Sequence, residues 1–271
     1  MDNPTTQFAA AAKPSSSGCK CGGTGRKHRS TPCGSIDTST PVEKPDLAIY
    51  SQAEELQNGN IPSWDNPDIV TNSWIPFRLM PEAQVKIRNL SPTVPAINAQ
   101  VHYYISPFGI GTRKQLLLTK VVNISPSSEL QLLFPLDQAT LNGDPRVGVH
   151  IRIEHPHDEK LLNNSGSQVH SGAMTSESGR NFTVQIPVFN DSHFSQEIFL
   201  SVMPTDVLAS VTPTVRMFAP FEQFIATLHI QVPAGLHGTP AAYLSRSATV
   251  VGRLGSGDLI GGATHLIRID N

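Results

Sequence analysis

The sequence predicts an all-β protein with two immunoglobulin-like β-sandwich domains that follow a disordered N-terminal tail. Segments that alternate apolar and polar residues recur from residue 46 onward, with turn residues at roughly 8–12-residue spacing. Charged residues make up only 15% of the chain, which contains 22 Pro and 20 Gly, and this balance suits strands and turns. No segment of helix length shows amphipathic periodicity, which argues against a helical bundle.

The first domain is predicted over residues 46–160. Its clearest strand spans 147–153, where Val and Ile alternate with residues such as His150 that are expected to face water. The Pro-rich stretch 61–81 is expected to be an insertion outside the strands. Further strands are expected at 85–88, 101–105, 116–124 and 130–134.

A polar linker is predicted over residues 161–180 and a second domain over 181–271. Strands of the second domain are expected at 184–188, 198–202, 224–232, 248–251 and 266–269. Each half contains one Asn-x-Ser sequence directly after a strand, Asn89-Leu90-Ser91 and Asn190-Asp191-Ser192. Asn and Ser close turns by bonding the neighbouring backbone, so the match suggests two related modules.

Three motifs of the first domain follow one another in a characteristic order. Pro45-Asp46-Leu47-Ala48-Ile49 precedes Val85-Lys86-Ile87-Arg88-Asn89, and a small-residue stretch then leads into Val101-His102-Tyr103-Tyr104. This order resembles the CARDB family, the cell-adhesion-related domain found in bacterial and archaeal proteins. The resemblance covers residues 45–160 and implies an immunoglobulin-like sandwich of extracellular or envelope proteins. Such domains serve in adhesion, spacing or binding and have no catalytic site.

The first 45 residues are rich in Ser, Thr, Gly, Pro and Ala, which predicts disorder. Residues 1–36 contain five basic residues and one acidic residue, so the tail is basic although the whole chain has a formal charge of −2. Four tail residues could bind a tetrahedral zinc ion: Cys19, Cys21, His28 and Cys33. The alternatives are a flexible tail with reactive thiols or a basic segment attracted to an anionic surface.

The bulk properties restrict the location and the partners of the chain. A net charge of −2 argues against a general nucleic-acid-binding surface. The sequence shows neither a classical signal peptide nor a run of about eighteen apolar residues, so no transmembrane segment is predicted. These features favour a cytoplasmic protein or export without a leader, whereas the family resemblance favours an extracellular or envelope location. Exposed sheet edges would also allow self-association.

No complete catalytic motif occurs, so no catalytic residue and no cofactor is predicted. The predicted function is that of a non-catalytic structural, protein-binding or adhesion module. One alternative is an inert body that is anchored by an N-terminal tail which binds zinc or an anionic surface. The candidate partner surface consists of Trp64, Trp74 and Phe77, because exposed aromatic residues dominate interface hot spots. Alternatively, the Trp-bearing stretch folds down over an open end of the sandwich.

A rival prediction is a metal-dependent hydrolase that uses His150, His155 and His157 around a divalent metal. His155-Pro156-His157-Asp158 follows the strand that contains His150, so imidazole and carboxylate groups occur close together in the sequence. The alternative is an ordinary strand-end loop, since His and Asp are common turn residues.

Overall fold

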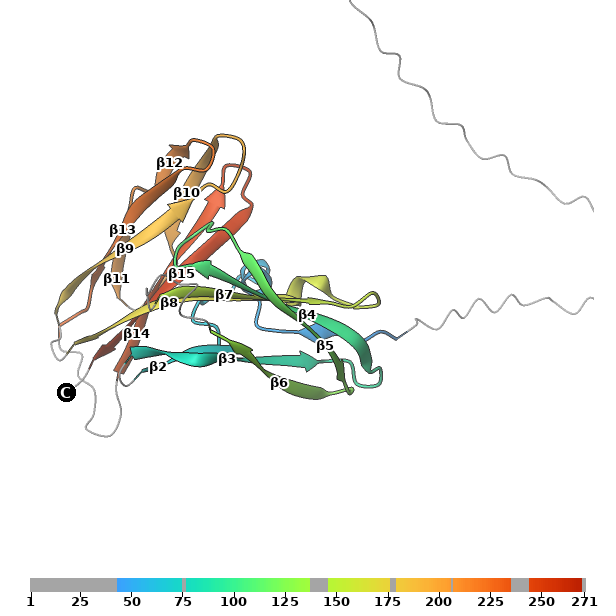
Figure 1. Ribbon diagram of the computed structural model, residues 1–271. Coiled ribbons are helices and arrows are strands. Elements are labelled where there is room, and N and C mark those ends of the chain that lie inside the picture. Colours follow the sequence, from blue (N-terminus) through green and yellow to red (C-terminus); the bar gives the residue numbers. More distant parts are fainter. Residues whose placement is uncertain are drawn as a thin grey trace, which may run out of the picture. The chain divides into compact units, whose positions relative to one another are not determined.

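The structure is a computed structural model that describes residues 43–74, 77–136, 146–175, 179–205, 207–234 and 244–269 (Figure 1). The predicted all-β class is confirmed, because strands dominate these residues and the helices α1 and η2 are short. No helix within these ranges is long and apolar enough to cross a membrane. The predicted disordered tail lies outside the described residues, apart from its last three positions.

The first part of the chain contains these elements: β1 (Leu47–Ala48), α1 (Gln52–Gln57), β2 (Ile69–Trp74), β3 (Phe77–Asn89), β4 (Ala96–Pro107), β5 (Gln115–Ile124), β6 (Ser128–Pro135), β7 (Val147–Glu154), η2 (Leu161–Asn163) and β8 (Ser165–Thr175). The second part contains β9 (Asn181–Phe189), β10 (Gln196–Val202), β11 (Leu208–Thr212), β12 (Val215–Phe218), β13 (Gln223–Gln231), β14 (Leu244–Leu254) and β15 (Leu259–Ile269).

One long sheet runs through both parts of the chain. It has eight strands in the order β12-β10-β14-β15-β8-β7-β4-β5. A four-stranded layer consists of β1, β2, β3 and β6, and a three-stranded layer consists of β9, β11 and β13. The strand ladders are antiparallel except for β8 and β15, which pair in parallel at the centre of the long sheet.

The same pairing scheme occurs twice. In the first part β3 pairs with β6, β4 pairs with β5 and β7, and β7 pairs with β8. In the second part β9 pairs with β13, β10 pairs with β12 and β14, and β14 pairs with β15. We call these units the first and second repeat. The last strands of the two repeats, β8 and β15, join them.

The Asn-x-Ser match in the sequence corresponds to this structural repeat. Asn89 and Asn190 are both buried where the strand pairing of β3 and β9 ends. The Asn89 side-chain oxygen accepts a hydrogen bond from the Ser91 amide at 3.2 Å, and that of Asn190 accepts one from the Ser192 amide at 3.1 Å. Each amide nitrogen donates to two backbone carbonyls. The same buried turn therefore connects the first two strands of each repeat.

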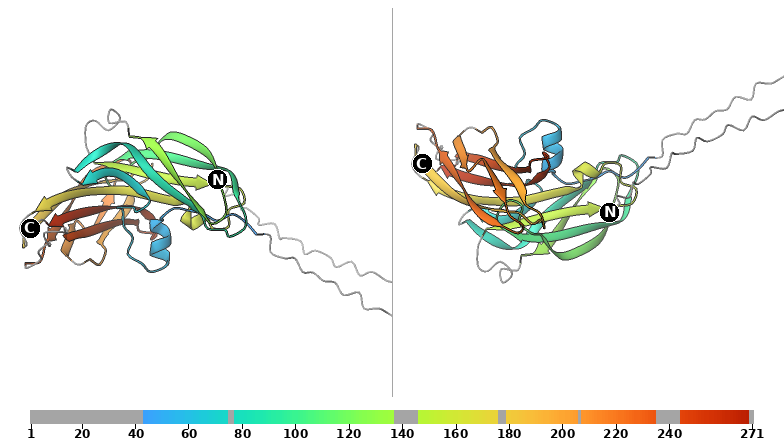
Figure 2. Two further views of the ribbon diagram at one scale, coloured as in Figure 1. Left: turned by 90° about the horizontal axis from the view of Figure 1, so that it is seen from below. Right: turned by 90° about the horizontal axis from the view of Figure 1, so that it is seen from above.

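Each repeat has its own hydrophobic core, and the cores lie on opposite faces of the long sheet. Val149 belongs to the first core and pairs with Gln168 on the adjacent strand, so both side chains point to the same face. Val169 follows Gln168, points to the other face and belongs to the second core. Figure 2 shows the layers of the first and second repeats on opposite sides of the long sheet.

The structure corrects two predictions of the chain's organisation. The predicted linker 161–180 contains β8, a strand that pairs with neighbours on both sides. The polar residues of β8 suggested a linker, but they form hydrogen bonds with residues about one hundred positions earlier in the chain, such as Gln52 and Asn66. The predicted insertion 61–81 contains β2 and the start of β3, so much of it belongs to the four-stranded layer.

Candidate functional site

The segment Ser63–Asp68, which we call the seam segment, lies across the junction of β8 and β15. The Trp64 amide donates to the Thr264 hydroxyl at 2.8 Å, and the Trp64 carbonyl accepts from the Val169 amide at 2.8 Å. The Trp64 side chain is only 2% exposed, and its ring packs on Gly262 so closely that a Cβ there would lie 2.6 Å from it. The seam segment thus covers the contact between the two repeats.

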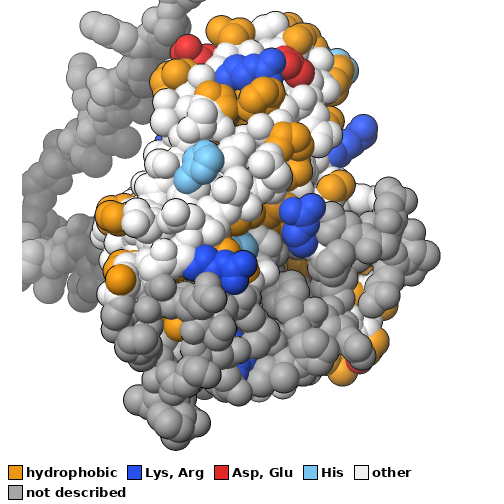
Figure 3. Space-filling model, turned by 90° about the vertical axis from the view of Figure 1, so that its left-hand side faces the viewer, with side chains coloured by type: hydrophobic (Ala, Val, Ile, Leu, Met, Phe, Trp, Pro, Cys, Tyr) orange, Lys and Arg blue, Asp and Glu red, His pale blue; other side chains and the backbone are white. Residues whose placement is uncertain are grey.

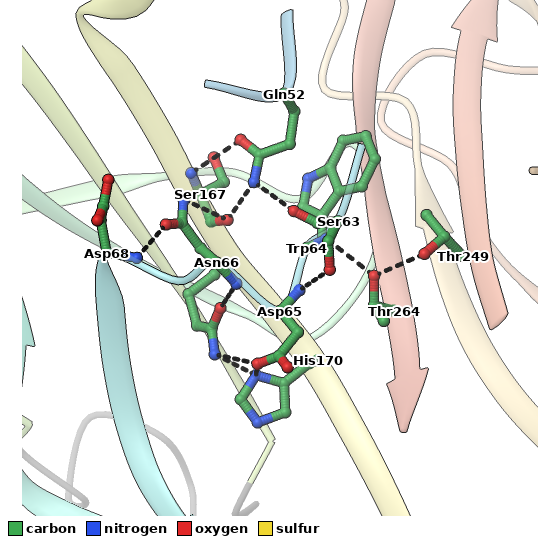
Figure 4. Close-up of polar contacts among 11 residues, drawn as sticks. Gln52, Ser63, Trp64, Asp65, Asn66, Asp68, Ser167, His170, Thr249 and Thr264 are labelled. Carbon is green, nitrogen blue, oxygen red and sulfur yellow. Dashed lines mark hydrogen bonds and ion pairs between the residues drawn. The ribbon is translucent and has the colours of Figure 1, made fainter. Parts of the chain in front are cut away.

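Buried amide side chains hold the seam segment in place (Figure 4). The Gln52 Nε2 group donates to the carbonyls of Ser63 at 2.8 Å and Ser167 at 2.6 Å, while its Oε1 accepts from the Ser167 amide at 3.1 Å. The side chain of Gln168 on β8 accepts from the Asn66 amide. Because these buried groups are satisfied by one another, β8 can be polar and still lie inside the protein.

The seam segment ends in an ion pair between the buried Asp68 and the half-buried Arg88. Asp68 accepts two hydrogen bonds from the Arg88 guanidinium, at 2.7 and 2.5 Å, and one from the Tyr50 amide at 2.7 Å. The hydrogen bond to Asp68 raises the pKa of Arg88 above its ordinary value. This bidentate pair ties the seam segment to β3 and acts structurally.

Two buried histidines flank the junction of β8 and β15. His170 contacts Gln168, and its Nδ1 lies 3.7 Å from an Asp65 carboxylate oxygen. Burial lowers the pKa of His170, although Asp65 opposes the shift. His265 Nδ1 lies 2.9 Å from the Ser171 hydroxyl, and burial together with His170 lowers the pKa of His265 to about 4. Both rings are therefore neutral at physiological pH.

His150 does not face water, and that prediction was wrong. Its Nε2 lies 2.9 Å from the Ser106 hydroxyl and its Nδ1 lies 2.8 Å from the Ser167 hydroxyl. Burial, aided by the charge of Lys114, holds the pKa of His150 well below its ordinary value. Strand alternation correctly predicts that His150 points away from the first core. Other parts of the chain cover that face of β7 as well, so the His150 side chain is buried.

The three histidines of the hydrolase hypothesis are not brought together. His155 and His157 lie on the turn after β7, with ring centroids 6.0 Å apart. His150 precedes His155 by five residues, which corresponds to about 16 Å along a strand. Among the described residues, no group of three or more His, Cys, Asp or Glu could hold a metal ion. The enzyme hypothesis itself stays untested.

A cleft of about 490 Å³ lies beside the turn after β7 that contains His155. Its polar and apolar lining includes Asn98, Gln100, Arg152, Glu154, His155, Leu161, Asn164 and Ser165. Arg152 and Glu154 form an ion pair at 2.9 Å, and His102 lies 3.4 Å from the other Glu154 oxygen. These contacts make the open face of the first repeat charged and polar.

The predicted site residues have different outcomes. The partner-surface prediction required exposure, and the buried Trp64 does not meet that condition. Trp74 and Phe77 lie at the ends of β2 and β3, which pair with each other there. The zinc candidates Cys19, Cys21, His28 and Cys33 lie outside the described residues and remain a prediction.

An exposed apolar strip lies on the open face of the second repeat. It consists of Phe199 on β10 with Val215 and Met217 on β12, whose exposed fractions are 42%, 44% and 59%. Phe199 pairs with Val215 across the two strands, and Met217 pairs with Glu197 one step along the same face. The sequence did not indicate this strip, because Phe199 stands between the core residues Ile198 and Leu200 and an unbroken apolar run does not tell which side is exposed.

Comparisons with known proteins do not assign the chain to a family. No family model and no curated protein matches it. Similar solved structures include activated Escherichia coli alpha-2-macroglobulin, with 9% identity, a TM-score of 0.28, and coverage of 85% of this chain and 22% of that one. They also include the calcium binding domain CBD12 of CALX1.1, with 13% identity and a TM-score of 0.19. That match covers 65% of this chain and 76% of the other. A third is the CupB6 tip adhesin from Pseudomonas aeruginosa, with 6% identity and a TM-score of 0.19. That match covers 83% of this chain and 96% of the other.

These likenesses are too low to carry an argument about fold or function. The chain spans only about a fifth of the macroglobulin's length. None of the three names a CARDB domain, so the CARDB resemblance remains a prediction.

Proposed function

We propose that this chain is a non-catalytic protein-binding module built from two immunoglobulin-like β-sandwich repeats, with CARDB-like adhesion as its specific form. The repeated pairing scheme and the two separate cores support the domain part of this proposal. The observation that carries the binding part is the apolar strip of Phe199, Val215 and Met217.

The apolar strip is suited to a protein partner. Fully burying an apolar side chain of this size contributes about 1.5–3 kcal/mol, so three neighbouring side chains can supply much of the energy of a modest interface. The strip lies on β10 and on β12, the edge strand of the long sheet. Glu197 on the same face, opposite Met217, provides a charged rim that can orient a partner.

The buried histidines have structural partners, which also favours binding over catalysis. His150 contacts two serine hydroxyls, while His170 and His265 contact side chains at the junction of the repeats. These rings are desolvated. The partners of His150 and His265 belong to neighbouring strands of the long sheet, whereas His170 contacts Gln168 on its own strand and Asp65 of the seam segment.

The test is chemical crosslinking of the purified full chain to protein extracts, including the envelope fraction, of the source cells. Crosslinked partners are quantified by mass spectrometry for the wild type, Phe199→Ser and Met217→Ser. The matched control is Leu133→Ser, which removes a similarly exposed apolar side chain from β6 of the first repeat.

A partner should be enriched by the wild type and the Leu133 variant and lost with both strip variants. Circular dichroism verifies that the strip variants stay folded. Equal enrichment by all four proteins, or enrichment of nothing above an inert β-sandwich, refutes the proposed role of the strip.

A further inference from the structure

The outer face of the three-stranded layer is a regular grid of side chains. Residues alternate along β9, β11 and β13, with one set in the second core and the other set outward. Where all three strands pair, the register places nine outward residues in three rows of three. The rows, which together we call the neutral grid, are Asn181, Gln231 and Leu208; Thr183, His229 and Ser210; and Gln185, Thr227 and Thr212. The same face continues along β9 and β13 with Pro187 opposite Ile225 and Phe189 opposite Gln223.

None of the nine residues of the neutral grid is Asp, Glu, Lys or Arg. Eight of them have an amide, hydroxyl or imidazole group, and Leu208 is the apolar member. Figure 3 shows this side of the molecule as mostly uncharged surface, in which hydrophobic side chains and a few charged ones are scattered. The face therefore offers many hydrogen-bond donors and acceptors but no permanent charge.

The first repeat supplies an internal comparison. The equivalent layer pairs β3 with β6, and its outward positions include Glu82, Lys86, Arg88 and Glu129. The fold therefore accommodates ordinary charged residues on this face. The neutral grid is a property of the second repeat and not a requirement of the strand topology.

The neutral grid is also hollowed. A shallow cleft of about 430 Å³ lies over its first two rows and is lined by six grid residues: Asn181, Thr183, Leu208, Ser210, His229 and Gln231. Phe182, a partly buried residue that packs against the second core, also lines the cleft. Polar groups thus line a depression whose volume is within the range of ordinary small-molecule sites.

We propose that the neutral grid binds a neutral polysaccharide. Hydroxyl-rich sugars match a surface of uncharged donors and acceptors, because each sugar hydroxyl can both donate and accept. An anionic or cationic ligand would find no opposite charge among the nine grid residues. Leu208 is the apolar member of the grid, and the exposed Ile225 lies in the next row. This inference does not rest on the proposed function, since the apolar strip lies on a different sheet.

The test is affinity electrophoresis of the full chain in native gels that each contain one soluble polysaccharide. The neutral probes are dextran, galactomannan, xyloglucan and hydroxyethyl cellulose, and polygalacturonate is the anionic probe. The variants are His229→Ala, Gln231→Ala and Thr183→Glu. The matched control is Gln131→Ala, which removes an exposed amide from the outer face of the first repeat.

At least one neutral probe should retard the wild type and the Gln131 variant equally. Each alanine variant in the grid should raise the dissociation constant about two- to tenfold, as expected for the loss of one hydrogen bond. Thr183→Glu should weaken retardation, because its longer side chain occupies part of the cleft.

Three results would each overturn the inference. They are the absence of retardation by all four neutral probes, retardation by polygalacturonate alone, and equal retardation of the wild type and Thr183→Glu. Sedimentation velocity on the same proteins detects self-association, and a grid variant that changes only the dimer fraction also counts against a polysaccharide ligand.

Discussion

Acid should weaken the junction between the repeats through His265. Its pKa is lowered from 6.5 to about 4 in the folded protein, mainly by burial. In the unfolded chain the ring takes up its proton at higher pH, so the unfolded state binds more protons between these two values. The free energy of unfolding therefore falls as the pH falls from about 6.5 to about 4.

The size of this effect follows from the pKa difference. One pKa unit corresponds to about 1.4 kcal/mol, so His265 contributes a loss of about 3 kcal/mol over the whole window. About 2 kcal/mol of this loss is reached near pH 5. The pKa values of His150 and His170 are lowered as well, so they add to the loss in the same direction.

Urea unfolding followed by circular dichroism, at several values between about pH 7 and about pH 5, measures this loss. The informative variant is His265→Asn, whose amide can still contact Ser171 but does not titrate. Its stability should depend less steeply on pH than that of the wild type, by about 2 kcal/mol over this range. His157→Gln, at an exposed turn position, is the control and should keep the wild-type slope. Identical slopes for the wild type and His265→Asn would refute the reasoning.

Three further substitutions test the seam and the repeated turn. Trp64→Ala should lower the free energy of unfolding by about 3–5 kcal/mol in urea titrations, because it empties a buried site. Gly262→Ala should cost about 1–3 kcal/mol, since the added methyl group meets the Trp64 ring; an unchanged melting temperature would contradict this packing. Asn89→Ala should cost about 1–3 kcal/mol by leaving buried carbonyls unsatisfied, whereas the exposed Leu90→Ala should cost less than about 0.5 kcal/mol.

The sequence predicts those parts of the fold that depend on local pattern. Alternation of Val and Ile with polar residues correctly identifies β7, and the Asn-x-Ser match marks equivalent turns in both repeats. The alternation fails for β8, because Gln168 and His170 are buried by contacts with a segment about one hundred residues earlier. Such long-range satisfaction of polar groups leaves no local signal.

The candidate surfaces were less predictable than the fold. The sequence left two alternatives for Trp64, an exposed contact surface or a segment folded down over the sandwich. Trp64 is buried, and its packing depends on the absence of a side chain at Gly262, far along the chain. The apolar strip and the neutral grid are defined by strand register. Register decides which residues of neighbouring strands share a face, and it cannot be read from one strand alone.

The parallel pairing of β8 with β15 has a consequence for biosynthesis. A ribosome delivers β8 long before β15, so one edge of the first repeat must wait unpaired while most of the second repeat is made. An apolar strand in that position would invite aggregation. The Ser, Gln, His and Gly residues of β8 can stay hydrated during this interval, so we expect this polar composition to disfavour aggregation of the nascent chain until the partner strand is made.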